Sequence, residues 1–313
     1  MTIQTGISKS LEITNRRSFL INGSLVMIGA GLGRKCVAKT FVSESVRTFE
    51  KPIVSVGLVT DLHYADKKPA GTRHYRESLE KLGVAADQFK KDKPDFIVEL
   101  GDFIDSADAL ETEKAHLDRV NKDFVKLPGK KYYVLGNHCV HNLKKKEFLE
   151  RVGQKESHFS FDAHGFHFIV LDSCFRNDGK PYERNNFDWT DPNIPTKQVD
   201  WLKEDLKSSK SKTIVFAHQR LDVENHYGVK NAKDVRKVLE QSKKVVAVFQ
   251  GHSHANDYKS IGDIHYCTLV AMVEGSGRKN NAFSTMQIFE NEVIKINGFA
   301  KQKEYEWSPK QPL

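Results

Sequence analysis

The chain has 313 residues, of which 39% are hydrophobic and 29% charged, enough for one large domain or two small ones with a sizeable core. No run reaches the roughly 18 apolar residues of a membrane-spanning helix, so no stable span is expected. The formal charge of +8 is compatible with a nucleic-acid partner. The N-terminus contributes part of that charge and is considered first.

The N-terminus predicts an export signal. Arg16-Arg17 precede a charge-free stretch from Ser18 to Gly33, and a small-residue site ends at Ala38. This order is typical of export signals, and the arginine pair resembles the bacterial twin-arginine type; an ordinary amphipathic helix is the alternative. Residues 1–38 hold five Lys and Arg residues and one Glu, so cleavage lowers the charge from +8 to +4. We therefore expect a periplasmic or extracytoplasmic protein with no nucleic-acid partner.

The cysteines do not indicate a disulfide framework. Cys36 falls within the expected signal, which leaves an odd number: Cys139, Cys174 and Cys267. These three are widely spaced, and the chain has no C-x-x-C pair of the kind that binds zinc.

Short apolar runs that end in polar or glycine-rich turns predict five strands in chain order: 53–60, 95–100, 132–135, 213–217 and 245–250. Periodic segments between several of them predict helices over 73–92, 113–127, 196–209 and 232–242, with Thr196 as an N-cap. Five further runs predict adjacent, antiparallel strands: 158–162, 166–173, 263–272, 283–289 and 292–299.

Strands that alternate with helices indicate an α/β fold, and the antiparallel additions suit a four-layer αββα sandwich of two mixed β-sheets flanked by helices. We expect an export signal at 1–38, a linker at 39–51, one domain at 52–302 and a tail at 303–313. Two long polar loops, 175–195 and 219–231, are candidates for function.

Each of the five predicted strands that alternate with helices ends at side chains that bind metals. In an open α/β sheet such ends can converge on one site. Oxygen and imidazole ligands without thiolate suit Mn²⁺, Fe or Zn²⁺, and the groups are too many for one ion, so two ions bridged by a carboxylate are expected. The groups are Asp61, His63, Asp102, Asn137, His138, His218, His252 and His254.

The blocks Asp61-x-His63, Gly101-Asp102-x-x-Asp105, Gly136-Asn137-His138, His218 and Gly251-His252-x-His254 resemble, in order, those of the calcineurin-like metallophosphoesterase superfamily. Each block alone is weak, but the five span roughly residues 52–300. The resemblance implies hydrolysis of phosphate bonds by in-line attack of a hydroxide that bridges two metal ions.

The resemblance also implies a role for each residue. Asp61, His63, Asp102 and His254 would hold the first ion, Asn137, His218 and His252 the second, and Asp102 would bridge. His138 would act as a general acid rather than a ligand, and Asp105 would orient it. From the residues alone, Asp105 equally suits a cap for a helix that begins beyond Ser106.

A narrower resemblance, to the Mn²⁺-dependent ADP-ribose/CDP-alcohol diphosphatases, rests on Tyr64-Ala65-Asp66 and on the segment Arg73-His74-Tyr75-Arg76-Glu77-Ser78-Leu79. That subgroup often has Gln where His63 stands. The resemblance implies hydrolysis of phosphodiester or pyrophosphate bonds in a small phosphorylated or nucleotide-type substrate, bound by Arg73, Arg76 and Tyr64. Ordinary surface charge is the alternative for both arginines. Tyr64, His141 and Trp189 could line a nucleotide end, or pack as surface or core.

Cys139 stands where many members of the superfamily have an acid. The thiol is either a small apolar filler or a redox-sensitive group. The competing functions are a phosphomonoesterase on the same site, a non-catalytic scaffold and a nuclease. The oligomeric state is not indicated by the sequence.

Overall fold

The computed structural model describes residues 17–21, 24–28 and 51–308. The chain divides into two compact units, 1–50 and 51–313. In the first unit, β1 (Arg17–Ile21) pairs with β2 (Ser24–Ile28) in antiparallel fashion. The remainder of the expected export signal at 1–38 lies outside the described residues, as does nearly all of the expected linker.

The second unit contains two six-stranded sheets. The first sheet has the order β14-β13-β12-β3-β4-β5, in which β3, β4 and β5 are parallel and the others are antiparallel additions. The strands of this sheet are β3 (Val54–Val59), β4 (Phe96–Glu99), β5 (Lys130–Tyr133), β12 (Ala282–Ile288), β13 (Ile294–Ala300) and β14 (Tyr305–Trp307).

The second sheet has the order β10-β11-β9-β8-β7-β6. Its four central strands are parallel, and β6 and β10 are antiparallel edges. The strands of this sheet are β6 (Phe159–Ala163), β7 (Phe166–Val170), β8 (Thr213–Phe216), β9 (Val245–Gln250), β10 (Asp257–Ile261) and β11 (Ile264–Thr268).

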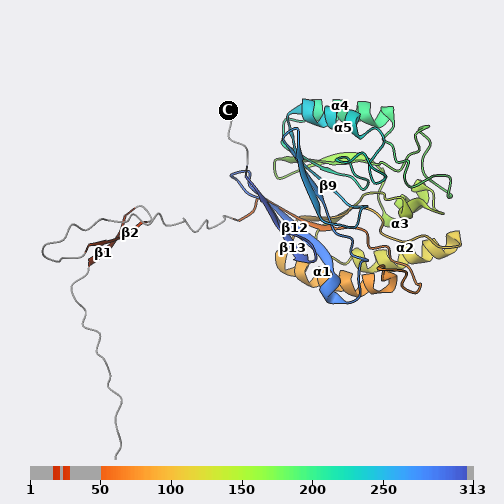
Figure 1. The fold of residues 1–313 in the computed structure, drawn as a ribbon, viewed down its shortest axis with the longest axis horizontal. Coiled ribbons are helices and arrows are strands. Elements are labelled where there is room, and N and C mark those ends of the chain that lie inside the picture. Colours follow the sequence, from red (N-terminus) through yellow and green to blue (C-terminus); the bar gives the residue numbers. More distant parts are fainter. Residues whose placement is uncertain (1–16, 22–23, 29–50, 309–313) are drawn as a thin grey trace, which may run out of the picture. The chain divides into compact units, whose positions relative to one another are not determined.

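The helices cover the outer faces of the sheets. Figure 1 shows α4 and α5 on one side of the domain and α1 and α2 on the other. The helices are α1 (Ser78–Asp92), which continues the 3-10 turn η1 (Tyr75–Glu77), α2 (Leu110–Phe124), α3 (Lys145–Val152), α4 (Thr196–Ser208) and α5 (Ala232–Ser242). Two more 3-10 turns are η2 (His138–Val140) and η3 (Arg278–Asn280).

Three apolar layers hold the domain together. One lies between the sheets, where residues such as Leu58 and Phe216 meet. A second joins the first sheet to α1–α3, and a third joins the second sheet to α4 and α5. Because β3 faces apolar side chains on both sides, all six of its residues are buried, as expected for a parallel strand covered on both faces. The predicted four-layer αββα sandwich is confirmed.

Several local expectations differ from the structure. The runs at 158–162 and 166–173 form the antiparallel pair β6–β7, and those at 283–289 and 292–299 form the antiparallel pair β12–β13, as expected. On their other sides β7 and β11 pair in parallel with β8 and β9, which was not expected; α4 provides the crossover between β7 and β8. Pro195, rather than Thr196, is the N-cap of α4. Helix α3 was not expected, since it is only eight residues long and only two of them are buried. Strand β14 pairs with β13 as far as Trp307, so the domain extends into the expected tail at 303–313.

The edge strand β5 is covered by one side chain. Gln154 accepts a hydrogen bond from the main-chain N–H of Tyr133 (2.9 Å) and donates one to the carbonyl oxygen of Tyr133 (2.8 Å). Both polar groups that Tyr133 presents at the edge of the sheet are therefore satisfied by an amide.

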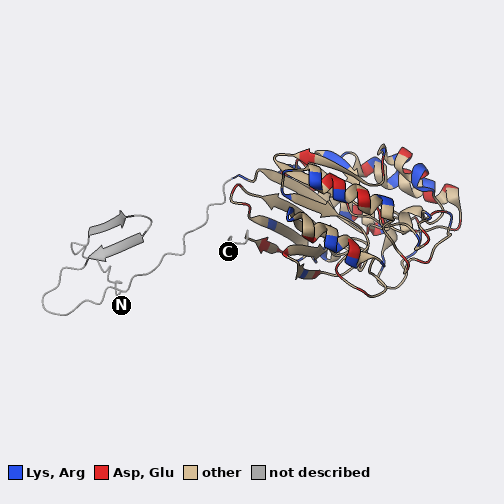
Figure 2. Cartoon of the chain, turned by 90° about the horizontal axis from the view of Figure 1, so that it is seen from above, with Lys and Arg blue, Asp and Glu red and all other residues tan. Residues whose placement is uncertain are grey.

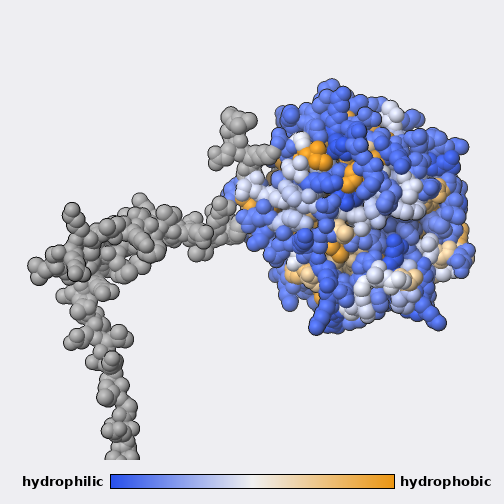
Figure 3. Space-filling view, in the orientation of Figure 1, coloured by the Kyte–Doolittle hydropathy of each residue, from blue (hydrophilic) through white to orange (hydrophobic). Residues whose placement is uncertain are grey.

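The charged residues lie mainly on the helices and loops, as Figure 2 shows for both signs of charge. The face seen in Figure 3 is mostly hydrophilic, with small, scattered apolar patches. Within the described residues, none of the helices is both long enough and apolar enough to cross a membrane.

Candidate metal centre

The predicted ligands lie on loops that follow five strands, and main-chain hydrogen bonds tie these loops together. The N–H of Asp61, after β3, donates to Gly101 O (2.9 Å), and the N–H of His63 donates to Asp102 O (2.8 Å). In the other sheet, the N–H of Gly251 donates to His218 O (3.1 Å). Because the parallel strands of both sheets end at one edge, the ligands gather there.

Backbone strain is concentrated at these loops. Positive φ angles, which non-glycine residues rarely adopt, occur at five of the predicted ligands: Asp61 (51°), His63 (43°), Asp102 (55°), His252 (68°) and His254 (60°). Such strain persists only where the surrounding structure fixes it, and it is common at functional sites.

The first group of convergent ligands is Asp61, His63 and His254. Asp61 Oδ1 lies 3.6 Å from His63 Nε2 and 3.3 Å from His254 Nε2. The two Nε2 atoms lie 3.1 Å apart. Asp61 and His63 are fully buried, and His254 is largely so.

The second group is Asp102, His218 and His252. Asp102 Oδ2 lies 3.1 Å from His218 Nε2 and 3.5 Å from His63 Nε2, so this oxygen faces both groups. The ring centroids of His218 and His252 lie 5.0 Å apart. Asn137, predicted as a further ligand, is also buried, and its Oδ1 has no hydrogen-bond partner.

The site suits divalent cations because lone pairs of imidazole nitrogens face lone pairs of carboxylate oxygens. His63, His218 and His254 each direct Nδ1 at an oxygen: Asp105 Oδ1 (3.0 Å), Leu100 O (2.8 Å) and Glu274 Oε1 (2.6 Å). In the neutral form of each ring, with Nδ1 as the donor, Nε2 carries a lone pair, and that lone pair points into a cluster of carboxylate oxygens. Buried atoms without a hydrogen-bond partner include Asp61 Oδ1, Asn137 Oδ1, His218 Nε2 and His252 Nε2. Such a cluster needs positive charge.

Two glycines allow the carboxylates to reach this cluster. A Cβ on Gly136 would lie 2.2 Å from Asp102 Oδ1, and a Cβ on Gly251 would lie 2.5 Å from Asp61 Oδ2. Because the backbone of each loop touches a ligand from another loop, any side chain at either position would displace that ligand.

Asp105 contacts two imidazoles at once. Its Oδ1 lies 2.7 Å from His138 Nδ1 and 3.0 Å from His63 Nδ1, and Lys67 pairs with its other oxygen. Helix α2 begins only at Leu110, with Ala109 as its N-cap, so Asp105 is not a helix cap. His138 is 23% exposed and lies at the surface of the cluster.

Charge within the cluster shifts several pKa values. Burial opposes ionisation of Asp102, but the facing charges of His218 and His138 hold its pKa well below the ordinary range. Burial lowers the pKa of His252 to about 3, with a further contribution from His218. Burial also disfavours the charged form of His254, yet hydrogen bonds to Asp61 and Glu274 raise its pKa to about 9.

A cavity of about 580 Å³ opens over both groups. Arg73 lines it, with Nη1 3.9 Å from Asp105 Oδ1. Trp189 also lines it and is 41% exposed. A neighbouring cavity of about 450 Å³ is lined by Trp189 together with His138, His141 and Phe187. Trp189 and His141, expected at a nucleotide end, therefore both lie beside the cluster.

Two residues predicted to bind substrate lie elsewhere. Tyr64 is 7% exposed and packs in the core edge-on to His116, because its loop turns it away from the cavity and under α2. The Arg76 side chain is exposed and pairs with Asp66, which directs it along the surface. Neither residue lines the cavity over the cluster.

Glu274, whose carboxylate accepts a hydrogen bond from His254, was not predicted from the sequence. It lies in the irregular segment between β11 and β12, where no strand end marks it. The one available signal is that Glu274 is the only acidic residue between Asp263 and Glu290.

Cys139 is fully buried in the layer between the first sheet and its helices. Burial and the nearby carboxylate of Glu99 raise the pKa of its thiol well above the ordinary value. A buried, protonated thiol is a poor nucleophile, so the structure favours the filler interpretation over the redox one.

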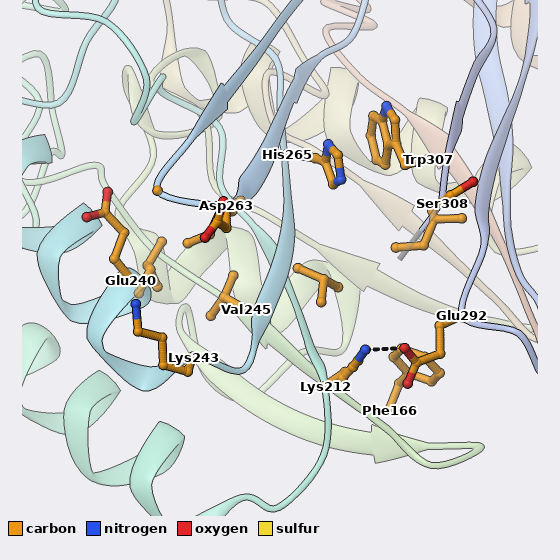
Figure 4. Close-up of a pocket in the computed structure, with 15 residues that line it drawn as sticks. Phe166, Lys212, Glu240, Lys243, Val245, Asp263, His265, Glu292, Trp307 and Ser308 are labelled. Atoms are coloured by element: carbon orange, nitrogen blue, oxygen red, sulfur yellow. Dashed lines mark hydrogen bonds and ion pairs between the residues drawn. The ribbon is translucent and has the colours of Figure 1, made fainter. Parts of the chain in front are cut away.

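A further cavity, of about 270 Å³, lies at the opposite ends of the strands (Figure 4). Its lining includes Phe166, Val245 and Ile264, the first residues of β7, β9 and β11, together with Trp307 and the ion pair of Lys212 with Glu292. None of the predicted site residues lines it.

Residues 54–256 match the family model described as calcineurin-like phosphoesterase. The chain is 26% identical to a manganese-dependent ADP-ribose/CDP-alcohol diphosphatase of Xenopus laevis, over 79% of this chain and 88% of that protein. The Oryza sativa subsp. japonica protein of the same name is 23% identical, over 79% and 91%. A dimetal phosphatase from Danio rerio has the same fold, with a TM-score of 0.74 and 20% identity over 82% of this chain and 99% of that chain.

Proposed function

The chain belongs to the calcineurin-like phosphoesterase family, which makes it a metal-dependent hydrolase of phosphate ester or diphosphate bonds, and we propose that its substrates are nucleotide-linked diphosphates and its two ions Mn²⁺. The observation that carries this proposal is one cavity that joins the ligand cluster to the guanidinium of Arg73 and the indole of Trp189. The diphosphatases named above, from Xenopus laevis and rice, support the same substrate class.

The residues divide naturally between two ions. Asp61, His63 and His254 would hold the first ion, Asn137, His218 and His252 would hold the second, and Asp102 would contact both through the oxygen that faces both groups. Two bound divalent ions supply positive charge to phosphate oxygens and lower the pKa of bound water. Carboxylate, amide and imidazole ligands without thiolate are compatible with Mn²⁺.

His138 would deliver the proton to the leaving group. Asp105 Oδ1 lies 2.7 Å from Nδ1 of His138, so Nε2 would be the atom that meets substrate. In its charged form His138 donates the Nε2 proton to the departing oxygen, and Asp105 stabilises that charged form. The same carboxylate fixes the ring of His63, so Asp105 orients the acid and the metal ligand together.

The cavity offers separate contacts for phosphate and base. Arg73 can donate to the phosphate that is not attacked, since a guanidinium matches phosphate oxygens. The rings of His226, His252 and Tyr227 lie beside Trp189 at interplanar angles of 89°, 67° and 44°, so none of the three stacks in parallel on a face of the indole. A planar base stacked on that face gains about 1–3 kcal/mol.

A purified preparation tests the proposal in two assays. We expect two Mn²⁺ per chain, and faster hydrolysis of ADP-ribose or CDP-alcohols than of p-nitrophenyl phosphate or cyclic nucleotides. Trp189→Ala should raise KM for the nucleotide-linked substrates and leave that for bis(p-nitrophenyl) phosphate unchanged. A preference for p-nitrophenyl phosphate would indicate a phosphomonoesterase instead, and fewer than two ions with no hydrolysis would indicate a scaffold.

We also propose export by the twin-arginine route to an extracytoplasmic location, on the basis of Arg16-Arg17 and the stretch to Ala38. That route carries folded proteins, which would let the ions bind before export. Replacing both arginines with lysine should block export in a bacterial host, and normal export of the double variant would rule the assignment out.

A further inference from the structure

Glu274 lies at the rim of the cavity, outside both groups of ligands. Its Oε1 accepts a hydrogen bond of 2.6 Å from Nδ1 of His254, and its side chain is 25% exposed. It is the only described residue whose carboxylate approaches His254 from the side away from the cluster; Asp61 faces the opposite nitrogen, Nε2.

We propose that Glu274 is a positioning residue for the first metal ion, and that it sets the affinity of that position without affecting the second. The inference rests on the two-ion site of the proposed function. By holding the proton on Nδ1, Glu274 keeps the Nε2 lone pair of His254 directed at the ion and makes the ring a better donor.

The segment that carries Glu274 is rigidly anchored. Lys81, 1% exposed in α1, donates from Nζ to three main-chain oxygens, those of Met272 (2.8 Å), Glu274 (2.8 Å) and Gly275 (2.7 Å). The N–H of Val273 donates to Asp61 O (3.1 Å). The backbone next to Glu274 is therefore tied to the backbone of a first-ion ligand, and the carboxylate lies against Nδ1 of His254.

The two metal positions differ in how their imidazoles are supported. Both imidazoles of the first group bond to carboxylates, His63 to Asp105 and His254 to Glu274. His218 of the second group bonds to the carbonyl oxygen of Leu100. A carboxylate raises the basicity of a ligating imidazole more than a neutral carbonyl does, so loss of Glu274 should weaken the first position selectively.

A matched control lies in η1, which contacts the same segment. Glu77 accepts hydrogen bonds from the N–H of Gly277 (2.6 Å) and from the hydroxyl of Ser276. It therefore holds the segment as Glu274 does, but it does not touch a predicted ligand. Glu77→Gln separates a general structural effect from the positioning of His254.

The test is a stepwise Mn²⁺ titration of the metal-free full-length protein by calorimetry, with thermal melting to check the fold. We expect Glu274→Ala to weaken one of the two steps by about 10–100-fold and to leave the other unchanged. Glu274→Gln should weaken that step less because the amide oxygen still accepts the Nδ1 proton, and Glu77→Gln should leave both steps unchanged. Equal weakening of both steps, or the same loss in Glu77→Gln, would overturn the inference.

The substrate assay is scored separately. If the wild-type protein binds two Mn²⁺ with the expected dependence on Glu274 but does not hydrolyse nucleotide-linked diphosphates, the positioning role holds and the proposed substrate class fails. If the diphosphates are hydrolysed and Glu274→Ala binds both ions as the wild type does, the proposed substrate class holds and the positioning role fails.

Discussion

Replacing Gly136 with alanine should disable the site while leaving the fold intact. The new Cβ would lie 2.2 Å from Asp102 Oδ1 and 2.3 Å from the main-chain nitrogen of Asp102. Real Cβ atoms essentially never approach closer than 3.0 Å, so Asp102 or the loop must move by at least 0.8 Å. The same Oδ1 also accepts the N–H of His138 at 2.8 Å, so the shift disturbs a predicted ligand and the predicted acid together.

A misplacement of about 1 Å costs on the order of 100-fold in rate, or about 2.7 kcal/mol of transition-state stabilisation. We therefore expect kcat/KM for bis(p-nitrophenyl) phosphate to fall at least about 100-fold at saturating Mn²⁺. Overpacking should cost about 1–3 kcal/mol of stability, which thermal melting measures. Bound metal is measured by mass spectrometry on the same samples.

Gly83→Ala is the matched control. Gly83 lies within α1, and a Cβ there would meet no atom within 4 Å. This change should raise stability by about 0.5–1 kcal/mol through helix propensity and leave activity unaltered. A Gly136→Ala protein with both ions and activity within threefold of wild type would refute the close-approach reasoning.

Three further changes have definite expected outcomes. Cys139→Asp places a second acid beside buried Glu99 and should lower the free energy of unfolding by about 3 kcal/mol or more. Urea unfolding measures this loss, and a variant as stable as the wild type would contradict the placement of Cys139 in the core. His138→Ala should bind two Mn²⁺ but lose about 10²–10⁴ in kcat; loss of an ion instead would make His138 a ligand. Burial opposes the charged form of His167, but Asp205 and Asp162 raise its pKa. Because the pKa of His167 in the folded protein exceeds the unfolded value near 6.5, charged His167 stabilises the fold fully below about pH 6. This stabilisation is lost as pH rises through the folded pKa. Asp205→Asn should therefore cost about 1.5 kcal/mol at pH 5.5 and less at pH 8.5; a pH-independent deficit would refute the linkage.

The sequence predicted the location of the cluster because parallel strands end at one edge of a sheet. A ligand directly after such a strand, as Asp61 is after β3, can be placed without knowing the rest of the fold. Glu274 could not be placed in this way, because it follows no strand end and its segment is fixed by Lys81 from a distant helix. Tyr64 was misplaced for a related reason: residue spacing does not tell which way a loop side chain turns.

The antiparallel additions show the same limit at the level of the fold. The runs that form β7 and β11 look like their antiparallel neighbours in sequence, since apolar content does not encode strand direction. Direction follows from the connections, and α4 was predicted without being assigned as the crossover that makes β7 and β8 parallel.

The side chain of Gln154 has a consequence beyond the fold of one chain. An open edge strand is a template on which a strand from another molecule can pair and begin aggregation. Because Gln154 occupies the N–H and C=O of Tyr133, it imitates a neighbouring strand one residue long and denies that template to other chains. A single amide thus blocks strand pairing at Tyr133, on the edge of the sheet that contains the predicted bridging ligand.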